Sequence, residues 1–116
     1  MILVTGPMFS GKKDLVKKWF DWDEAEFAKK VCWDVEKLAA GGEELPALAQ
    51  KLAQYQVVIA SEIGGGIVPA DPEQRRQRER AGRLACLLAE HARTVVRVCC
   101  GIPQVLKGEL PPDKAS

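Results

Sequence analysis

A chain of 116 residues with 47% hydrophobic and 28% charged residues is long enough for one domain with a single core and too short for two. The formal net charge of +1 excludes a general electrostatic attraction to nucleic acid or to an anionic membrane surface. The longest apolar runs are strand-sized, which excludes a membrane span, and no targeting signal is recognised, so we expect a cytoplasmic protein.

The first third of the chain predicts a strand, a glycine-rich turn and a helix. Residues 1–5 are an apolar run typical of a buried strand, and residues 6–13 form the turn. A helix is predicted over residues 12–20, with its apolar side chains on one face. Residues 21–30 either continue this helix or form a loop, and residues 31–34 predict a weak second strand.

The remainder of the chain alternates helices and strands. Residues 43–54 predict an amphipathic helix, residues 56–61 an apolar third strand, and residues 94–100 a fourth strand. Between the last two, Asp71 is the expected N-cap of a long helix that runs to about Ala92. This order predicts an α/β fold with a mainly parallel sheet of about four to five strands. Together with a G-x-x-x-x-G-K turn after the first strand, it predicts a P-loop NTPase-like three-layer sandwich. We expect one domain over residues 1–108 and a loose C-terminal tail over residues 109–116.

The glycine-rich turn fits the phosphate-binding pattern G-x-x-x-x-G-K, and it stands between a strand and a helix as that pattern requires. Its glycines let the backbone wrap a phosphate, its amides donate to the phosphate oxygens, and its lysine reaches the β- and γ-phosphates. The next position, which normally carries a hydroxyl that holds Mg²⁺, is Lys13. We therefore expect this turn to bind ATP or GTP, with weakened binding of Mg²⁺. The residues concerned are Gly6, Pro7, Met8, Phe9, Ser10, Gly11, Lys12 and Lys13.

Two acidic residues follow predicted strands, at the sheet edge where ligands gather in parallel sheets. Glu62 closes the third strand and is a candidate catalytic residue, as a base toward a substrate hydroxyl or as a ligand of Mg²⁺. Asp34, at the end of the second strand, is the other candidate for Mg²⁺ or substrate contact. Gly64 and Gly66 permit a close approach of backbone to ligand.

The long helix begins with a cluster of arginines, and the chain contains four cysteines. On sequence alone the arginines are typical of a solvated helix face with pairs to glutamates. The cysteines lack C-x-x-C spacing and are expected to be buried reduced thiols rather than a zinc site. The arginines are Arg75, Arg76, Arg78, Arg80 and Arg83, and the cysteines are Cys32, Cys86, Cys99 and Cys100.

Residues 62–107 resemble the second half of the bifunctional adenosylcobinamide kinase / adenosylcobinamide-phosphate guanylyltransferase family. That family shows an E-V-G-x-G-I-V-P loop, to which Glu62–Pro69 is similar with Ile63 in place of the valine. It also shows an R-R-x-R-[DE]-x-x-G helix, matched by Arg75 to Gly82. A late G-x-P-x-x-x-K is matched by Gly101 to Lys107. The resemblance implies phosphoryl transfer from ATP or GTP to an alcohol such as that of cobinamide. It also implies that Arg75, Arg76 and Arg78 contact substrate or a neighbouring subunit of a homo-oligomer, with a trimer favoured.

The chain departs from the family where the guanylyl-accepting histidine belongs. That histidine lies in a segment between the phosphate loop and the second strand, and residues 21–30 contain none. The single histidine, His91, falls near the end of the last helix and is expected to be structural or at the surface. We therefore expect a shortened member without the guanylyltransferase step. A non-catalytic nucleotide- or partner-binding remnant is the alternative, and a thymidine-kinase-like nucleoside kinase, suggested by the wording of residues 6–12, is a second one.

Overall fold

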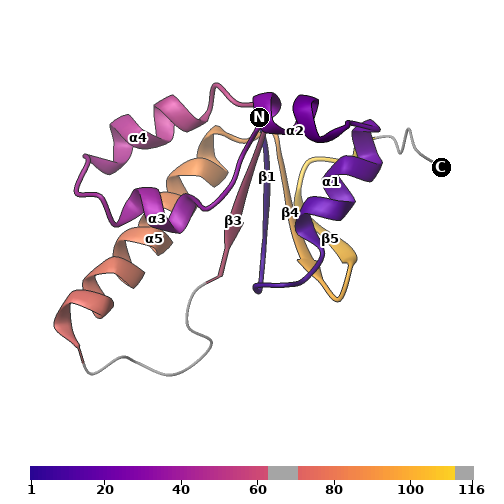
Figure 1. Cartoon of the computed structure of the whole chain (residues 1–116). Helices are drawn as coiled ribbons and strands as arrows, with labels where there is room; N and C mark the ends of the chain where they lie inside the picture. Colours follow the sequence, from indigo (N-terminus) through magenta and orange to yellow (C-terminus); the bar gives the residue numbers. More distant parts are fainter. Residues whose placement is uncertain (63–70, 112–116) are drawn as a thin grey trace.

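The computed structural model describes residues 1–62 and 71–111. Within them, five strands form one sheet in the order β2-β3-β1-β4-β5 (Figure 1). The first four strands in this order are parallel to one another, and β5 pairs with β4 in the antiparallel direction. The strands are β1 Ile2–Gly6, β2 Val31–Cys32, β3 Val57–Ser61, β4 Thr94–Cys99 and β5 Ile102–Lys107.

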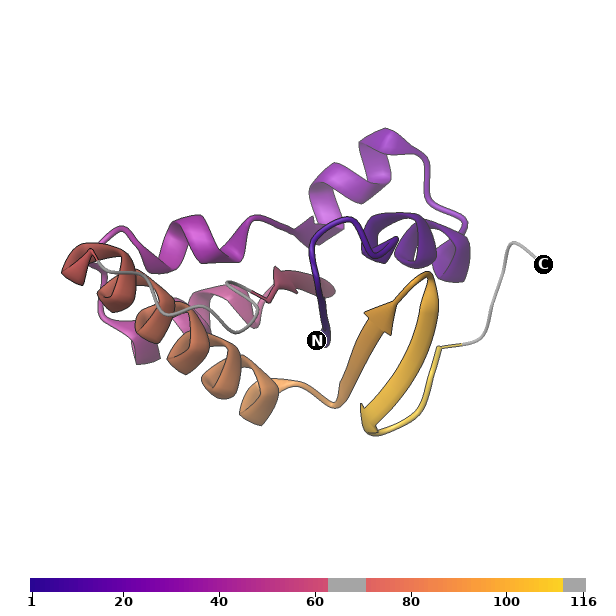
Figure 2. The same cartoon turned by 90° about the horizontal axis from the view of Figure 1, so that it is seen from below.

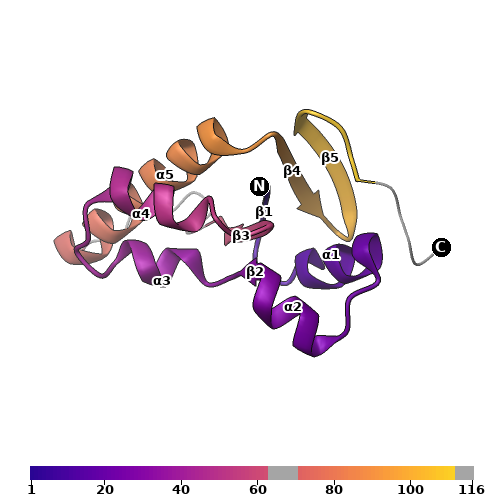
Figure 3. The same cartoon turned by 90° about the horizontal axis from the view of Figure 1, so that it is seen from above.

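In the described ranges, five helices cover the two faces of the sheet (Figure 3). Helices α1 and α2 lie on one face, while α3, α4 and α5 lie on the other, so the fold has three layers (Figure 2). None of these helices is long and apolar enough to cross a membrane. The helices are α1 Lys12–Phe20, α2 Glu24–Lys30, α3 Val35–Ala39, α4 Leu45–Leu52 and α5 Pro72–His91.

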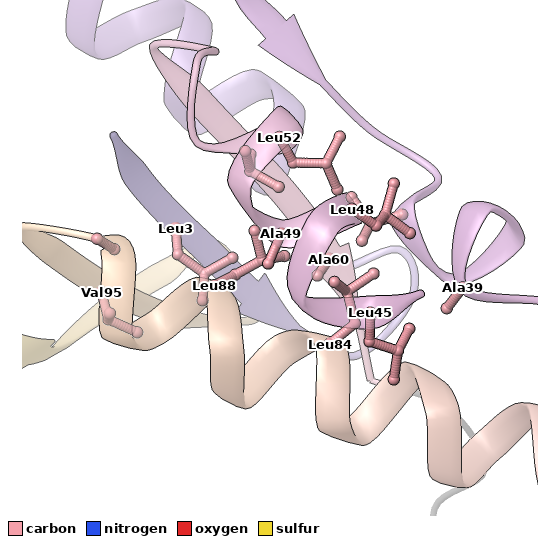
Figure 4. Packing of buried hydrophobic residues seen from close by; sticks show 13 residues of the cluster. Leu3, Ala39, Leu45, Leu48, Ala49, Leu52, Ala60, Leu84, Leu88 and Val95 are labelled. Atoms are coloured by element: carbon pink, nitrogen blue, oxygen red, sulfur yellow. The ribbon is translucent and has the colours of Figure 1, made fainter. Parts of the chain in front are cut away.

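The central strands carry apolar side chains on both faces, and helices bury both of these faces. Side chains alternate along a strand, so Leu3 points toward α4 and α5 (Figure 4), whereas Val4 packs with the α1 and α2 layer. Leu84 and Leu88, four residues apart on α5, are fully buried in the first of these clusters. The two buried clusters therefore confirm the prediction, made from the apolar runs, of a parallel sheet covered on both faces.

Most predicted elements are present, and three were not foreseen. Asp71 caps α5 as expected, since its carboxylate accepts a hydrogen bond from the amide of Glu73 at 2.9 Å. Residues 21–30 are neither a continuation of α1 nor a loop. Asp21 adopts the left-handed conformation with φ 55°, which ends α1 and starts a separate helix α2. Helix α3 and the edge strand β5 were also missed.

The second strand and the cysteines require corrections. Strand β2 is only two residues long and ends before Asp34, which caps α3. The expectation of buried cysteines is wrong, because Cys32 is half-buried and the other three thiols are exposed. Cys99 ends β4 and Cys100 lies in the β4–β5 turn with φ 54°, so neither side chain reaches the core. All four thiols are free. Of the expected tail, residues 112–116 lie outside the described residues.

Candidate functional site

The candidate site lies at the carboxyl edge of the parallel strands, between β1 and β3. The connection that follows β1 leads into α1 on one face, and the chain after β3 reaches α5 on the other face (Figure 1). In open α/β sheets, connections that leave adjacent strands toward opposite faces open a crevice between them, and ligands bind there.

The glycine-rich turn leaves β1 with a backbone that requires glycine. Gly6 has φ 142°, and a Cβ atom built there would lie 2.2 Å from the carbonyl oxygen of Val98. Gly11 caps α1 with φ 88° and no side-chain cap, so the first amides of the helix face the turn. Two hydrogen bonds anchor the turn at 2.8 Å each, from the amide of Glu62 to Gly6 O and from the amide of Gly101 to Ser10 O.

Among the described residues, Lys12 is the only charged residue that is buried, at 7% exposure. Its ammonium group lies inside the turn and donates to Gly6 O at 3.3 Å, to Ser10 Oγ at 3.3 Å and to the carbonyl of Pro7. Burial lowers the pKa of Lys12, and the negative charges of Glu36 and Glu62 act in the opposite direction. The turn thus places a lysine and the amino end of a helix around one point, as phosphate binding requires.

A cavity of about 360 Å³ adjoins this turn. On its α3 side lie Trp33 and Asp34, and Asp34 has φ 58° at the start of that helix. The ammonium of Lys13 lies 5.0 Å from the centroid of the Trp33 ring, in a cation–π contact. The structure thereby brings the turn and Asp34 together, as expected. Met8 and Phe9 line the same cavity and are strongly exposed.

Glu62 forms a bidentate ion pair with Arg97, a residue that was not predicted from the sequence. The Nε of Arg97 donates to one carboxylate oxygen at 2.6 Å, and its Nη2 donates to the other at 3.1 Å. These hydrogen bonds lower the pKa of Glu62 and raise that of Arg97. The signal available in the sequence was a single charge inside the apolar run of β4, near its carboxyl end.

A second cavity, of about 410 Å³, lies between α3 and α5 beside the end of β3. Of the expected arginines, Arg78 lines it, whereas Arg76 pairs with Glu73 at 3.2 Å and Arg75 lines neither cavity. Arg80 has a structural role, because it donates to Ala39 O at 2.7 Å and so joins α5 to α3. Gly64 and Gly66 lie outside the described residues.

Glu36, on α3, is the other site residue that the sequence did not reveal. It lines both cavities, and its Oε2 atom is buried without a hydrogen-bond partner. His91 is exposed at the carboxyl end of α5, three residues before the start of β4. This end of α5 lies at the amino-terminal ends of the parallel strands, away from the candidate site (Figure 1). In the described part of the chain, no three His, Cys, Asp or Glu side chains converge as a metal site.

Comparison with known proteins connects this site with one family. The family model described as cobinamide kinase / cobinamide phosphate guanyltransferase matches residues 20–106, which is well over half of the chain. The matched range contains Glu36, Glu62, Arg78 and Arg97 and begins at the last residue of α1, after the glycine-rich turn. No curated protein matches the chain.

Proposed function

Because the chain belongs to the cobinamide kinase / cobinamide phosphate guanyltransferase family, we propose that it binds ATP or GTP and transfers the γ-phosphoryl group to an alcohol of cobinamide. The observation that carries this proposal is the turn at residues 6–12, with Lys12 buried inside it and a cavity beside it. The match itself starts after the turn, so the geometry of the turn supports nucleotide binding independently.

The turn supplies the groups that bind the phosphates. Amides of residues 8–12 and the amino end of α1 donate to phosphate oxygens, while Lys12 exchanges its carbonyl partners for oxygens of the β- and γ-phosphates. Negative charge that builds up on the γ-phosphoryl group during transfer is then stabilised by an ammonium group that is already in place. Glu62, which Arg97 keeps ionised, is a poor proton acceptor and acts as a fixed negative charge that interacts with the Lys12 ammonium group.

Calorimetry tests the binding step directly. Titration with ATP and with GTP is expected to give saturable heat at sub-millimolar to millimolar nucleotide. The absence of saturable heat with either nucleotide at millimolar concentration would remove the basis of the proposal.

The described residues do not fit a magnesium site built from protein ligands. Lys13 stands where a hydroxyl is needed, and both oxygens of Glu62 are bonded to Arg97. The other carboxylates that line this cavity, Asp14, Asp34 and Glu36, do not converge as a metal site in the described part of the chain. No step of the proposed reaction is therefore assigned to Mg²⁺.

Replacing Lys13 with serine is expected to make nucleotide binding more dependent on Mg²⁺, since the substitution removes a positive charge and restores a hydroxyl ligand. The measurement is the affinity for ATP with Mg²⁺ and with EDTA, in the variant and in the unchanged protein. An equal effect of Mg²⁺ in both proteins would show that Lys13 does not weaken the metal site.

We propose that the guanylyltransferase step is absent. Residues 21–30 contain no histidine. His91 lies at the amino-terminal ends of the parallel strands, whereas the phosphate loop lies at their carboxyl ends. Incubation with α-labelled GTP is expected to leave no acid-labile, base-stable label on the protein. A stoichiometric label that disappears in a His91→Ala variant would identify His91 as the nucleophile and contradict this prediction.

A non-catalytic nucleotide- or partner-binding role is the second candidate function. It is favoured by Lys13, which removes the usual metal ligand while leaving the phosphate-binding amides and Lys12 in place. The two functions differ in one result: a remnant would bind nucleotide and form no cobinamide phosphate.

We also propose a homo-oligomer, with the trimer favoured by the family resemblance. Ile102, Val105 and Leu106 on the edge strand β5 expose apolar side chains that a neighbouring subunit would cover. A neighbour would also bring Arg75 or Arg76 within reach of a phosphate loop.

Light scattering at micromolar concentration is expected to give a mass near a multiple of 12.7 kDa. A 12.7 kDa monomer with full nucleotide affinity would rule out a site shared between subunits.

A further inference from the structure

The cavity between α3 and α5 is continuous in its lining with the phosphate-loop cavity. Glu36 and Ser61 line both, so a molecule in the 410 Å³ cavity lies next to the position of a bound triphosphate. The rest of its wall includes both charged groups and small apolar residues, among them Glu62, Arg78, Glu79, Ala60, Ala81 and Ala85. This combination suits an alcohol arm that carries polar groups, and the cavity is too small for a whole corrin ring.

Glu36 carries a structural cost because one of its carboxylate oxygens lacks a hydrogen-bond donor. Its Oε2 atom is buried and makes no hydrogen bond within the described part of the chain. A buried carboxylate oxygen without a donor destabilises a fold, and such groups call for a functional explanation. The two other carboxylates of the cavity are accounted for, since Glu62 is bonded to Arg97 and Glu79 pairs with Arg83 at 2.7 Å.

We propose that this cavity binds the acceptor alcohol and that Glu36 is the base that accepts the proton of its hydroxyl. The proposal rests on the proposed kinase function and names the acceptor site and the base of the same reaction. The hydroxyl of the acceptor supplies the hydrogen-bond donor that Oε2 otherwise lacks, and the shared lining places that hydroxyl beside the γ-phosphate.

The proposed step transfers the γ-phosphoryl group to the acceptor and the acceptor's proton to Glu36. The hydroxyl oxygen forms a bond to the γ-phosphorus, and its proton passes to Glu36 Oε2. The bond between the γ-phosphorus and the bridging oxygen breaks, and ADP or GDP leaves with that electron pair. Lys12, whose charge interacts with that of Glu36, lies on the phosphate side of this exchange.

Glu36 fits the role of base better than Glu62 because of their partners. Glu62 has both oxygens bonded to Arg97, which disfavours its protonation. Glu36 has no ion pair among the described contacts, and the charged groups that share its two cavities are Lys12, Lys13, Asp14, Asp34, Glu62, Arg78 and Glu79.

Two substitutions separate the base from the cavity. Glu36→Gln removes the base with little change of shape, and Ala85→Leu fills the cavity from α5 without touching the phosphate loop, since Ala85 lines only the larger cavity. Glu90→Leu, an exposed change on the same helix, is the matched control. Each variant is measured for thermal unfolding, ATP affinity, cobinamide affinity by equilibrium dialysis, and formation of cobinamide phosphate.

We expect Glu36→Gln to fold with an unchanged or higher melting temperature and to bind ATP within about twofold of the unchanged protein. Its turnover is expected to fall by roughly 10²- to 10⁴-fold, the usual contribution of a general base. Ala85→Leu is expected to weaken cobinamide binding by about tenfold or more, because the added side chain takes space that the acceptor needs, while ATP affinity stays unchanged. Glu90→Leu is expected to change none of these quantities.

Each contrary result has a distinct meaning. Full turnover in Glu36→Gln would overturn the base assignment, and loss of Mg²⁺-dependent ATP binding in that variant would make Glu36 a metal ligand instead. Unchanged cobinamide affinity in Ala85→Leu would overturn the cavity assignment. If the unchanged protein binds cobinamide without phosphorylating it, the kinase proposal and the base fail, whereas the Ala85→Leu result still decides the cavity.

Discussion

Replacement of Lys12 with alanine is expected to weaken ATP and GTP binding by roughly 30- to 150-fold, the equivalent of about 2–3 kcal/mol for hydrogen bonds to a charged group. The reason is that Lys12 is the ammonium group held inside the turn, where it donates to Gly6 O and Ser10 Oγ until phosphate oxygens replace them. Calorimetric titration of the variant measures the loss, and phosphoryl transfer is expected to fall below detection with it.

The matched control for this prediction is Lys51→Ala. Lys51 lies on α4 and pairs with Glu43 at 3.2 Å, outside the lining of the phosphate-loop cavity. Its removal is expected to leave nucleotide affinity unchanged. Equal affinity in Lys12→Ala and the unchanged protein would mean that the turn does not bind phosphates.

Replacement of Gly6 with alanine is expected to lower the free energy of unfolding by about 3 kcal/mol or more, through backbone strain combined with overpacking. The added Cβ would lie 2.2 Å from Val98 O, a backbone atom in the neighbouring strand that cannot move without disturbing the sheet. At φ 142° the backbone itself also disfavours any side chain. Urea denaturation measures the change, with the slope of the transition as a check on two-state behaviour.

Gly42 offers a control that isolates the strain from the collision. It has φ 82°, and a Cβ atom there would have open space around it. Gly42→Ala is therefore expected to cost only about 1–2 kcal/mol, the strain of a left-handed alanine. A Gly6→Ala variant as stable as Gly42→Ala would show that the close packing of β1 against Val98 is not as described.

The parts of the fold that sequence could predict are those specified by local patterns. The strand–turn–helix unit at residues 2–20 is encoded in neighbouring residues, and so is the capped start of α5 at Asp71. Buried parallel strands have continuous apolar runs, and for this reason β3 and β4 could be located from the sequence. The β1–α1 unit also carried the phosphate-binding prediction, since that motif needs only its immediate context.

The parts that sequence could not predict depend on contacts between distant segments. Arg97 meets Glu62 across 35 positions, and nothing near either residue indicates the pairing. Glu36 looks like a surface acid on a short helix until the fold places it between two cavities. Strand β5 lacks an apolar pattern because it lies at the edge of the sheet, where Pro103 is tolerated and most side chains face solvent.

The most direct test of the kinase assignment is the transfer of label from γ-labelled ATP or GTP to cobinamide by the unchanged protein. We predict labelled cobinamide phosphate, formed in proportion to protein concentration and absent when Lys12→Ala replaces it. Saturable nucleotide binding with no labelled cobinamide phosphate, under conditions in which cobinamide is also bound, would contradict the kinase assignment and identify the chain as a nucleotide-binding remnant.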